Sequence, residues 1–378
     1  MKTICPPEQC TGCALCLTLC PKKCISFKEG KLGHLYPVVN EGDCIDCGLC
    51  RKKCPSLSVF EKEKPSKAFA TWSKNEQIYS NSSSGGLATQ ISKCIIEQGG
   101  VVYGSAVLPD IVVRHIRVDN MEDISKLQGS KYVQSDIQET LRLIKTDIKR
   151  GVPTLFIGTP CQVAAVKNLF RDVPGNLFLI DLICHGVPSL NLLKRHIRKV
   201  ADCPHYDNVR FREGNQFFLS ISSGGKVVYH KTLRNPRYKE WYINTFFDGY
   251  VYRDSCYACH YACPERISDM TIGDFWGLGR KASADMIPAH PKGCSVALPI
   301  TDKGYKLLQS VSKDLNIYER TVDEAIEGND QLQHPTILGK RKRLFRLLYP
   351  VFGRVSYKIA IIDKYTKYQL KRILGKLK

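Results

Sequence analysis

The sequence lacks any uninterrupted apolar run of the length that a membrane-spanning helix needs, which is about 18 to 20 residues. Its first residues, MKTICPPEQC, also lack the apolar stretch that a secretory signal peptide contains. We therefore expect a cytoplasmic protein, in a compartment where thiols stay reduced and remain free to bind iron.

Two common phosphate-binding motifs are missing as well. Neither the glycine fingerprint of a dinucleotide-binding Rossmann fold nor a P-loop followed by lysine and serine or threonine occurs in the chain. Binding of NAD(P)H is therefore not expected. With 378 residues, of which 43% are hydrophobic, the chain is still long enough for two or three globular domains.

Cysteine, by contrast, is abundant, and one cysteine pattern occurs twice in the first 55 residues. CTGCALCLTLCP and CIDCGLCRKKCP both read C-x2-C-x2-C-x3-C-P. This spacing is typical of bacterial ferredoxins with two 4Fe-4S clusters, in which the fourth cysteine of each run ligates the cluster of the other run. A zinc knuckle or a disulfide framework fits eight cysteines in two identical registers poorly. The predicted ligands are Cys10, Cys13, Cys16 and Cys54 for one cluster, and Cys44, Cys47, Cys50 and Cys20 for the other.

Changes in composition divide the chain into four parts. We predict an α+β ferredoxin-like domain over residues 1–58 and a charged, proline-containing linker over 59–67. An α/β domain with a partly parallel sheet is expected over 68–330, followed by a basic amphipathic tail over 331–378.

A serine-glycine segment from Ser82 to Gly86 precedes an apolar helical pattern near the start of the α/β domain. Serines in this position cap helices, and their hydroxyls can also form an anion site together with the free N–H groups of the first turn. The motif alone leaves both interpretations, a plain N-cap and an anion site, open.

Residues 152–188 predict a parallel βαβ unit. They contain a buried strand, a tight turn at Gly158, a helix with Thr159 as its N-cap, and a second apolar strand that ends at Cys184. Ligands of such sheets bind beyond the carboxyl ends of the strands, so Cys161 and Cys184 are expected at the same edge. The position of Cys161 in the first turn of a helix should also favour its thiolate form.

These two thiols and the later CYAC motif predict a third 4Fe-4S cluster. Cys263 is a rival for the fourth ligand position. The alternative is that Cys161 and Cys184 are buried packing residues and that the later cysteines bind zinc or nothing. The predicted ligands are Cys161, Cys184, Cys256 and Cys259, whereas the isolated Cys5, Cys24, Cys94, Cys203 and Cys294 are interpreted as packing residues.

The C-terminal segment is strongly basic. The chain has a net charge of +20, and residues 340–378 contain 13 lysines and arginines against the single acid Asp363. Bands of leucine, phenylalanine, tyrosine and isoleucine alternate with these cations, which is typical of an interfacial amphipathic segment. We expect peripheral contact with the anionic inner face of a membrane, and we do not expect nucleic acid to be a partner.

Several motifs occur in one order along the chain: SSSGG, GSKYVQSD, GTPCQ, DLICHGVPS, and CYAC with IGDFWG. In this the chain resembles the coenzyme F-420 hydrogenase/dehydrogenase beta-subunit family, in the bacterial branch with a ferredoxin domain in front. The resemblance covers residues 1 to about 330 and implies a flavoprotein, usually with FAD. By this resemblance the flavin would contact Ser83, Ser84, Gly85, Gly86, Lys131, Gly158 and Thr159.

The predicted function is that of an iron-sulfur flavoprotein oxidoreductase with a two-electron substrate. Clusters carry single electrons, whereas a flavin can collect two for organic chemistry. Bacterial members of the family often resemble parts of cell-surface polysaccharide gene sets, which implies a substrate other than a deazaflavin. The alternative is an electron-transfer subunit that has no substrate of its own and feeds a partner enzyme.

Overall fold

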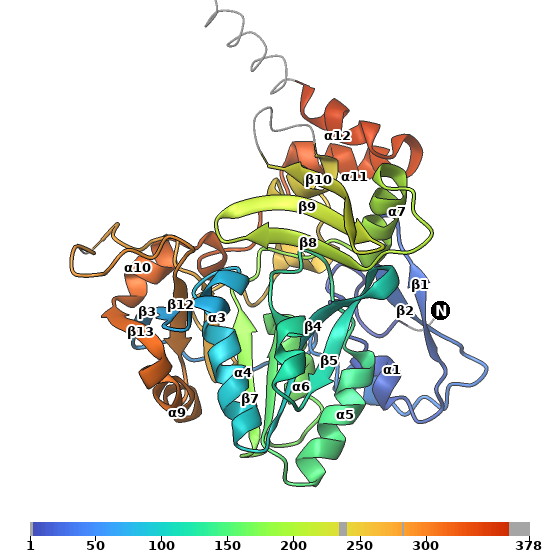
Figure 1. Ribbon diagram of the computed structural model, residues 1–378. Helices are drawn as coiled ribbons and strands as arrows, with labels where there is room; N and C mark the ends of the chain where they lie inside the picture. Colours follow the sequence, from blue (N-terminus) through green and yellow to red (C-terminus); the bar gives the residue numbers. More distant parts are fainter. Residues whose placement is uncertain (1–2, 234–239, 282, 363–378) are drawn as a thin grey trace, which may run out of the picture.

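The computed structural model describes residues 3–233, 240–281 and 283–362. Figure 1 shows a large central sheet with helices on both sides, an N-terminal region beside it, and a small sheet and the C-terminal helices above it. Within the described ranges, no helix is both long enough and apolar enough to cross a lipid bilayer.

The N-terminal region repeats one backbone feature in both cysteine runs. Ala14 and Gly48 each lie between the second and third cysteine of a run, each adopts a left-handed conformation (φ 63° and 67°), and each is followed directly by a short helix. A hairpin of two antiparallel strands lies between the runs. The elements are α1 (Leu15–Leu19), β1 (Ile25–Glu29), β2 (Leu35–Val39) and α2 (Leu49–Lys52).

The main sheet has eight strands among the described residues, and its centre is parallel. Strands β4, β6, β7 and β11 run parallel to their neighbours, and antiparallel strands extend the sheet on both sides. The predicted βαβ unit is confirmed, because β6 and β7 are parallel neighbours joined by a helix. The strand order is β13 (Leu315–Arg320), β3 (Ala68–Ser73), β12 (Ser295–Pro299), β11 (Met270–Asp274), β7 (Leu177–Leu182), β6 (Thr154–Gly158), β4 (Val101–Leu108), β5 (Val112–Val118).

Helices cover both faces of this sheet. Apolar side chains of α4 (Leu87–Glu97) and α9 (Asp302–Ser310) pack on one face, where Val102 and Leu155 point. On the other face, α5 (Gln138–Lys149) and α6 (Pro160–Lys167) form a core that also includes Leu15 of α1. The remaining elements near the sheet are α3 (Glu76–Asn81), α10 (Val322–Glu327), η1 (Pro109–Ile111), η2 (Glu122–Leu127), η4 (Ser312–Asp314) and η5 (Asp330–Leu332).

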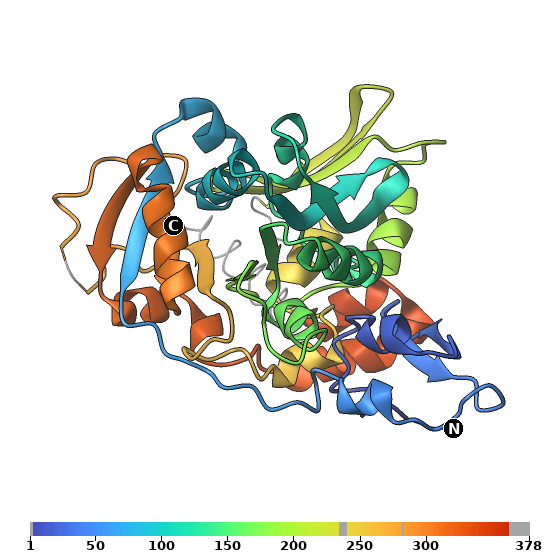
Figure 2. The same ribbon diagram turned by 90° about the horizontal axis from the view of Figure 1, so that it is seen from below.

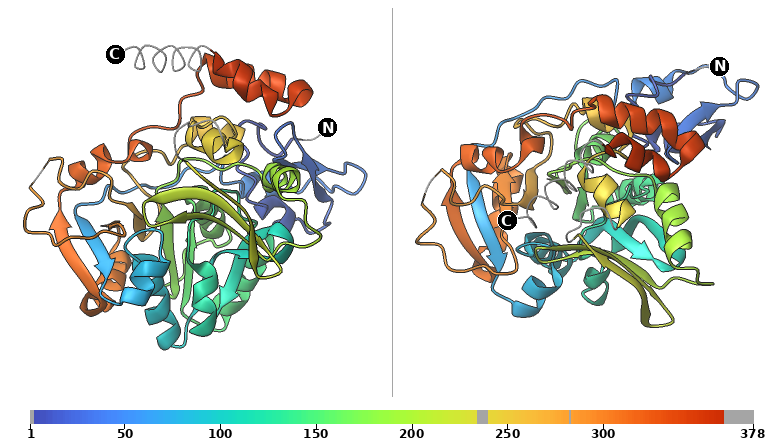
Figure 3. Two further views of the ribbon diagram at one scale, coloured as in Figure 1. Left: turned by 45° about the horizontal axis from the view of Figure 1, so that its top comes forward. Right: turned by 90° about the horizontal axis from the view of Figure 1, so that it is seen from above.

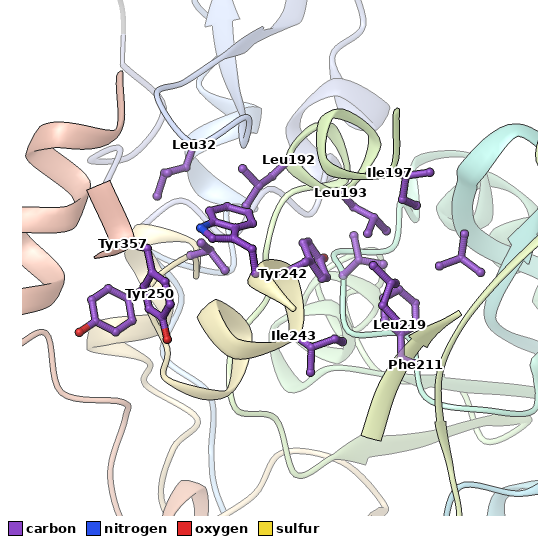
Figure 4. Close-up of a cluster of buried hydrophobic side chains, with 14 of the residues drawn as sticks. Leu32, Leu192, Leu193, Ile197, Phe211, Leu219, Tyr242, Ile243, Tyr250 and Tyr357 are labelled. Atoms are coloured by element: carbon purple, nitrogen blue, oxygen red, sulfur yellow. The ribbon is translucent and has the colours of Figure 1, made fainter. Parts of the chain in front are cut away.

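A separate hydrophobic cluster joins the N-terminal region, the small sheet and the C-terminal helices. Figure 4 shows Leu32 of the N-terminal region, Tyr242 of α8 and Tyr357 of α12 in this cluster. The C-terminal helices are therefore part of the folded core and are not merely an appended tail. The elements are α7 (Leu190–Val200), β8 (Asn208–Glu213), β9 (Gln216–Ser223), β10 (Lys226–Thr232), α8 (Trp241–Phe247), η3 (Asp254–Ala258), α11 (Lys340–Phe352) and α12 (Val355–Ala360).

Between the N-terminal region and β3 the chain runs along the outside of the molecule (Figure 2). Its one regular contact on the way is a β-bridge, in which the backbones of Glu63 and Arg266 exchange two hydrogen bonds of 2.8 and 2.9 Å. Arg266 follows the CYAC motif, so this connection is tied to the segment that carries the later cysteines.

The end of α10 is held against the turn after β11 by two glycines. A Cβ atom on Gly328 would lie 2.0 Å from the backbone nitrogen of Gly277, although the φ of Gly328 (−75°) suits any residue. We therefore expect Gly328→Ala to lower the free energy of unfolding by about 1 to 3 kcal/mol through overpacking alone. Gly175→Ala is the control, because a Cβ there meets nothing within 4 Å. Equal urea midpoints for the two variants would contradict this close contact.

Candidate functional site

The structure brings the N-terminal cysteines together in two sets. Burial, together with the neighbouring charges of Cys10 and Cys54, raises the pKa of Cys13 to about 12. The pKa of Cys16 is raised by burial and then by the charges of the same three thiols. The last cysteine of the second run thus lies with the first three of the first run. We call Cys10, Cys13, Cys16 and Cys54 the first set.

The second set surrounds a hollow of about 210 Å³. Cys20, from the first run, lines this hollow together with the first three cysteines of the second run. The second set therefore consists of Cys20, Cys44, Cys47 and Cys50.

Cys5 and Cys24, interpreted from the sequence as packing residues, contact these two sets. The Cys5 thiol hydrogen-bonds to Cys10 and Cys54, and this bond is the largest cause that lowers the pKa of Cys10 to about 6 and of Cys54 to about 7. The sulfurs of Cys24 and Cys20 lie 3.4 Å apart. Sequence spacing offered no sign of this, because neither cysteine falls within the repeated pattern.

A third set forms at the carboxyl edge of the main sheet, from Cys161, Cys184, Cys256 and Cys259. Cys161 lies in the first turn of α6, Cys184 follows β7, and Cys256 lies in η3. Burial is the largest cause that raises the pKa of all four thiols. The charges of Cys256 and Cys259 also raise the pKa values of Cys161 and Cys184.

The predicted thiolate preference of Cys161 is wrong for the protein without a bound cation. Its pKa is raised to about 12, since the cost of burying the charge exceeds what the hydrogen bond from Thr159 offsets. The rival ligand Cys263 neighbours Cys259, whose pKa its charge helps to raise. Its sulfur lies 3.5 Å from Nζ of Lys62 and 3.2 Å from the carbonyl of Glu265.

No three histidine, cysteine or acidic side chains of the described residues converge closely enough to hold a single metal ion. Four-cysteine sets are the donor chemistry of 4Fe-4S clusters. Because buried thiols with raised pKa values lose their protons only when a cation compensates the charge, the third set fits such a group.

A cavity of about 530 Å³ adjoins the third set. It lies at the carboxyl ends of β6 and β7, and both Cys161 and Cys184 form part of its wall. Apart from Gly85, the residues predicted to contact a flavin line this cavity: Ser83, Ser84, Gly86, Lys131, Gly158 and Thr159.

The serine-glycine segment does not cap α4 with a side chain. Gly86 is the N-cap, with φ 83°, and no side chain accepts a hydrogen bond from the first turn of the helix. Ser83 instead accepts one from the backbone of Ser130 (2.7 Å). The plain N-cap interpretation is therefore wrong, and the first amides of α4 lie at the cavity wall.

Gly85 has a structural position behind this wall. Its N–H donates to Oγ of Ser295 (2.9 Å), and a Cβ atom would lie 2.1 Å from the carbonyl of Thr71. Only a glycine allows the segment to pass so close to β3 and β12.

Two serine hydroxyls in the cavity wall, those of Ser84 and Ser105, are buried and have no hydrogen-bond partner among the described residues. Buried polar groups are normally satisfied, so these hydroxyls fit a polar ligand. Lys131, which donates to the carbonyls of Leu127 (2.8 Å) and Gln128 (2.7 Å), is the cation of this wall. Burial lowers its pKa to about 7.

Part of the cavity wall is aromatic, which the sequence did not predict. Phe217 and Trp276 flank the guanidinium of Arg212, which forms a two-bond ion pair with Asp274 at 2.6 and 2.8 Å. Trp276 is 40% and Phe247 39% exposed, so both rings are accessible. Asp274 and Trp276 belong to the IGDFWG motif, whereas Arg212 stands in no motif.

Comparisons of the sequence with family models cover most of the chain. The model for the C-terminal part of the coenzyme F420 hydrogenase/dehydrogenase beta subunit matches residues 153–325, and the model for the N-terminal part of the same subunit matches residues 68–142. A 4Fe-4S dicluster domain matches residues 9–57. No curated protein matches the sequence.

Among solved structures, the chain is similar to one from the F420-reducing (NiFe) hydrogenase complex of Methanosarcina barkeri, studied by xenon derivatization. The match covers 73% of this chain and 93% of that chain, with 18% sequence identity and a TM-score of 0.48. From the matching sequence models, this iron-sulfur protein belongs to the coenzyme F420 hydrogenase/dehydrogenase beta-subunit family, with a 4Fe-4S dicluster domain in front.

Proposed function

We propose that the protein is an iron-sulfur flavoprotein oxidoreductase, in which the cavity holds a flavin and the three cysteine sets hold 4Fe-4S clusters. The observation that carries this proposal is that Cys161 and Cys184 belong both to the third set and to the cavity wall. A single element, the carboxyl edge of β6 and β7, thus joins the cysteine ligands to the flavin site.

The residues around the cavity suit the polar parts of a flavin nucleotide. The first amides of α4 and the hydroxyls of Ser84 and Ser105 can donate to phosphate oxygens, since the end of a helix and unpaired donors favour anions. Lys131 can supply a positive charge next to them. A bound flavin would supply the two-electron chemistry that clusters lack.

The accessible aromatic part of the cavity wall, with Trp276 and Phe247, favours a substrate or partner group that binds there. An electron-transfer subunit without a substrate of its own remains the second candidate, because the same cavity would then serve only to pass electrons to another protein. Turnover of a small molecule by the purified, flavin-loaded protein would support the first; electron delivery only to an added partner would support the second.

The third cluster predicts the iron content of protein purified without oxygen. We expect about 12 irons per chain, four for each cluster, and about 8 in the Cys161→Ala, Cys184→Ala double variant. Cys294→Ala is the matched control, because Cys294 is buried in another part of the core, away from the three sets. This variant should retain all of the iron. Wild-type protein with about 8 irons would overturn the third cluster.

The pKa of Lys131 predicts how FAD binding depends on pH. Below pH 7 the side chain is charged and attracts the anionic groups of FAD, and above it the charge is lost. We therefore expect the affinity to fall up to about tenfold between pH 6 and pH 8. In Lys131→Met the affinity should be lower and independent of pH over this range, whereas Lys126→Met, on the exposed surface of η2, should behave as wild type. Fluorescence titration measures both, and an unchanged slope in Lys131→Met would exclude this role.

We further propose that α11 and α12 contact an anionic bilayer. Phe345 and Tyr357 are buried in the core, so the predicted tail is folded from Lys340 to Ile362; the part of that prediction beyond Ile362 lies outside the described residues. Figure 3 shows these helices on the outside of the molecule. Between residues 340 and 362 the chain has seven cations and no acid. The side chains that face solvent include Leu344, Leu347, Val351, Phe352, Val355 and Ile359.

Replacing two of these apolar side chains tests the bilayer contact. Leu347 and Val351 are 71% and 78% exposed, so the Leu347→Gln, Val351→Gln variant should fold normally. Losing about 3 kcal/mol of apolar burial should lower partition onto anionic vesicles at least tenfold in a sedimentation assay. Val59→Gln is the control, because Val59 is fully exposed and is far in sequence from α11 and α12. Equal sedimentation of all three proteins would refute the contact.

A further inference from the structure

One buried arginine lies between the first and the third cysteine set. Arg253 is only 1% exposed, and it directly precedes η3, which carries Cys256. Its backbone is fixed on both sides: its N–H donates to the carbonyl of Val187 (3.0 Å), and its carbonyl accepts from the N–H of Cys256 (3.0 Å). Arg253 thus belongs to the same segment as Cys256 and Cys259 of the third set.

The side chain of Arg253 reaches into the N-terminal region. Its Nη2 lies 3.5 Å from the sulfur of Cys10 and donates to the carbonyl of Leu35 (2.6 Å), and its Nε donates to the carbonyl of Cys10. The guanidinium also lies over the ring of Tyr36, 4.4 Å from its centroid. Among the described residues, one side-chain oxygen accepts from the guanidinium, namely Oε1 of Gln134 from Nη1 (3.2 Å).

The cysteine run itself is shaped to receive this side chain. Gly12 lies between Cys10 and Cys13 with φ 69°, and a Cβ atom there would be 2.6 Å from Nη1 of Arg253. A larger residue at this position would therefore displace the guanidinium from the first set.

Among the described residues, no carboxylate forms an ion pair with Arg253. The adjacent Asp254 instead pairs with Arg346 and accepts a hydrogen bond from Tyr36. A buried cation without a counter-ion is costly. Backbone carbonyls, Gln134 and the ring of Tyr36 offset part of this cost, and the sulfur of Cys10 is the contacting group that can carry a full negative charge. On the side of the third set, the backbone carbonyl of Arg253 accepts from the N–H of Cys256, so Arg253 lies directly beside the segment that carries this ligand.

We propose that Arg253 is a positioning residue that provides the common positive charge for the clusters of the first and third sets, and that it stabilises the reduced state of both. This inference rests on the proposed function. Uptake of one electron adds one negative charge to a cluster, and nearby cations and hydrogen bonds to sulfur raise its reduction potential. Because Arg253 bonds to Cys10 and directly precedes η3, which carries Cys256, its charge would raise the potentials of both clusters together.

Redox titration of the full-length protein, followed by electron paramagnetic resonance, tests this role. In Arg253→Met, we expect the reduced fraction of the first-set cluster at a given potential to fall at least tenfold, which corresponds to a shift of about −59 mV for one electron. The third-set cluster should shift in the same direction, and the second-set cluster, which Arg253 does not contact, should shift less. Arg253→Lys should restore part of the effect, because it keeps the charge and loses the planar fork.

Arg320→Met is the matched control. Arg320 is a largely buried arginine on β13, at the far end of the main sheet from β6 and β7, and its loss should leave all cluster potentials unchanged. If Arg253→Met does not fold, Arg253→Gln, which keeps amide donors for the carbonyls, decides the same point. Full iron content with unchanged potentials in the neutral variant would overturn the proposal. Wild-type protein with about 8 irons would remove the third cluster alone, and the shift of the first-set cluster would still be measurable.

Discussion

The burial of thiol groups is the constraint on which the rest of this structure depends. Cys161, Cys184 and the CYAC pair are half-buried, in surroundings where a thiolate is costly unless positive charge lies beside it. The start of α6 alone does not provide enough, since the pKa of Cys161 still rises. A thiolate in this set therefore needs further positive charge to compensate it, and η3, which carries Cys256, directly follows the buried Arg253.

The mixed sheet explains why the cavity and the cysteines meet. Parallel strands β6 and β7 end at the same edge, so the segments that leave them carry Cys161 and Cys184 to one place. The antiparallel strands beside them serve a different purpose. β3 and β12 hold the segment before α4 through Gly85 and Ser295, and so fix the wall that carries Ser84.

Regular spacing of residues made part of the fold and of the candidate site predictable from the sequence. The repeated cysteine pattern and the βαβ unit follow from periodicities of a few residues, which the sequence displays directly, and the parallel pairing of β6 and β7 is confirmed. The roles of Gly85 and Gly86 could not be separated, because their difference arises from contact with β3 and β12 and from a positive φ. Arg253 could not be found at all, since its partners are 119 to 243 residues away in the chain. The tail shows the same limit, because an amphipathic pattern does not reveal that Phe345 and Tyr357 face a core.

The three cysteine sets differ in how far they lie from water, and this has a consequence for the durability of the protein. Cys47 of the second set is exposed, Cys10, Cys13 and Cys54 of the first set are buried, and the four cysteines of the third set, beside the cavity, are half-buried. Molecular oxygen that diffuses to the protein would therefore meet the outer set first. Oxidative damage would then begin at Cys47, and the buried sulfurs of Cys10, Cys13 and Cys54 would be the last to react.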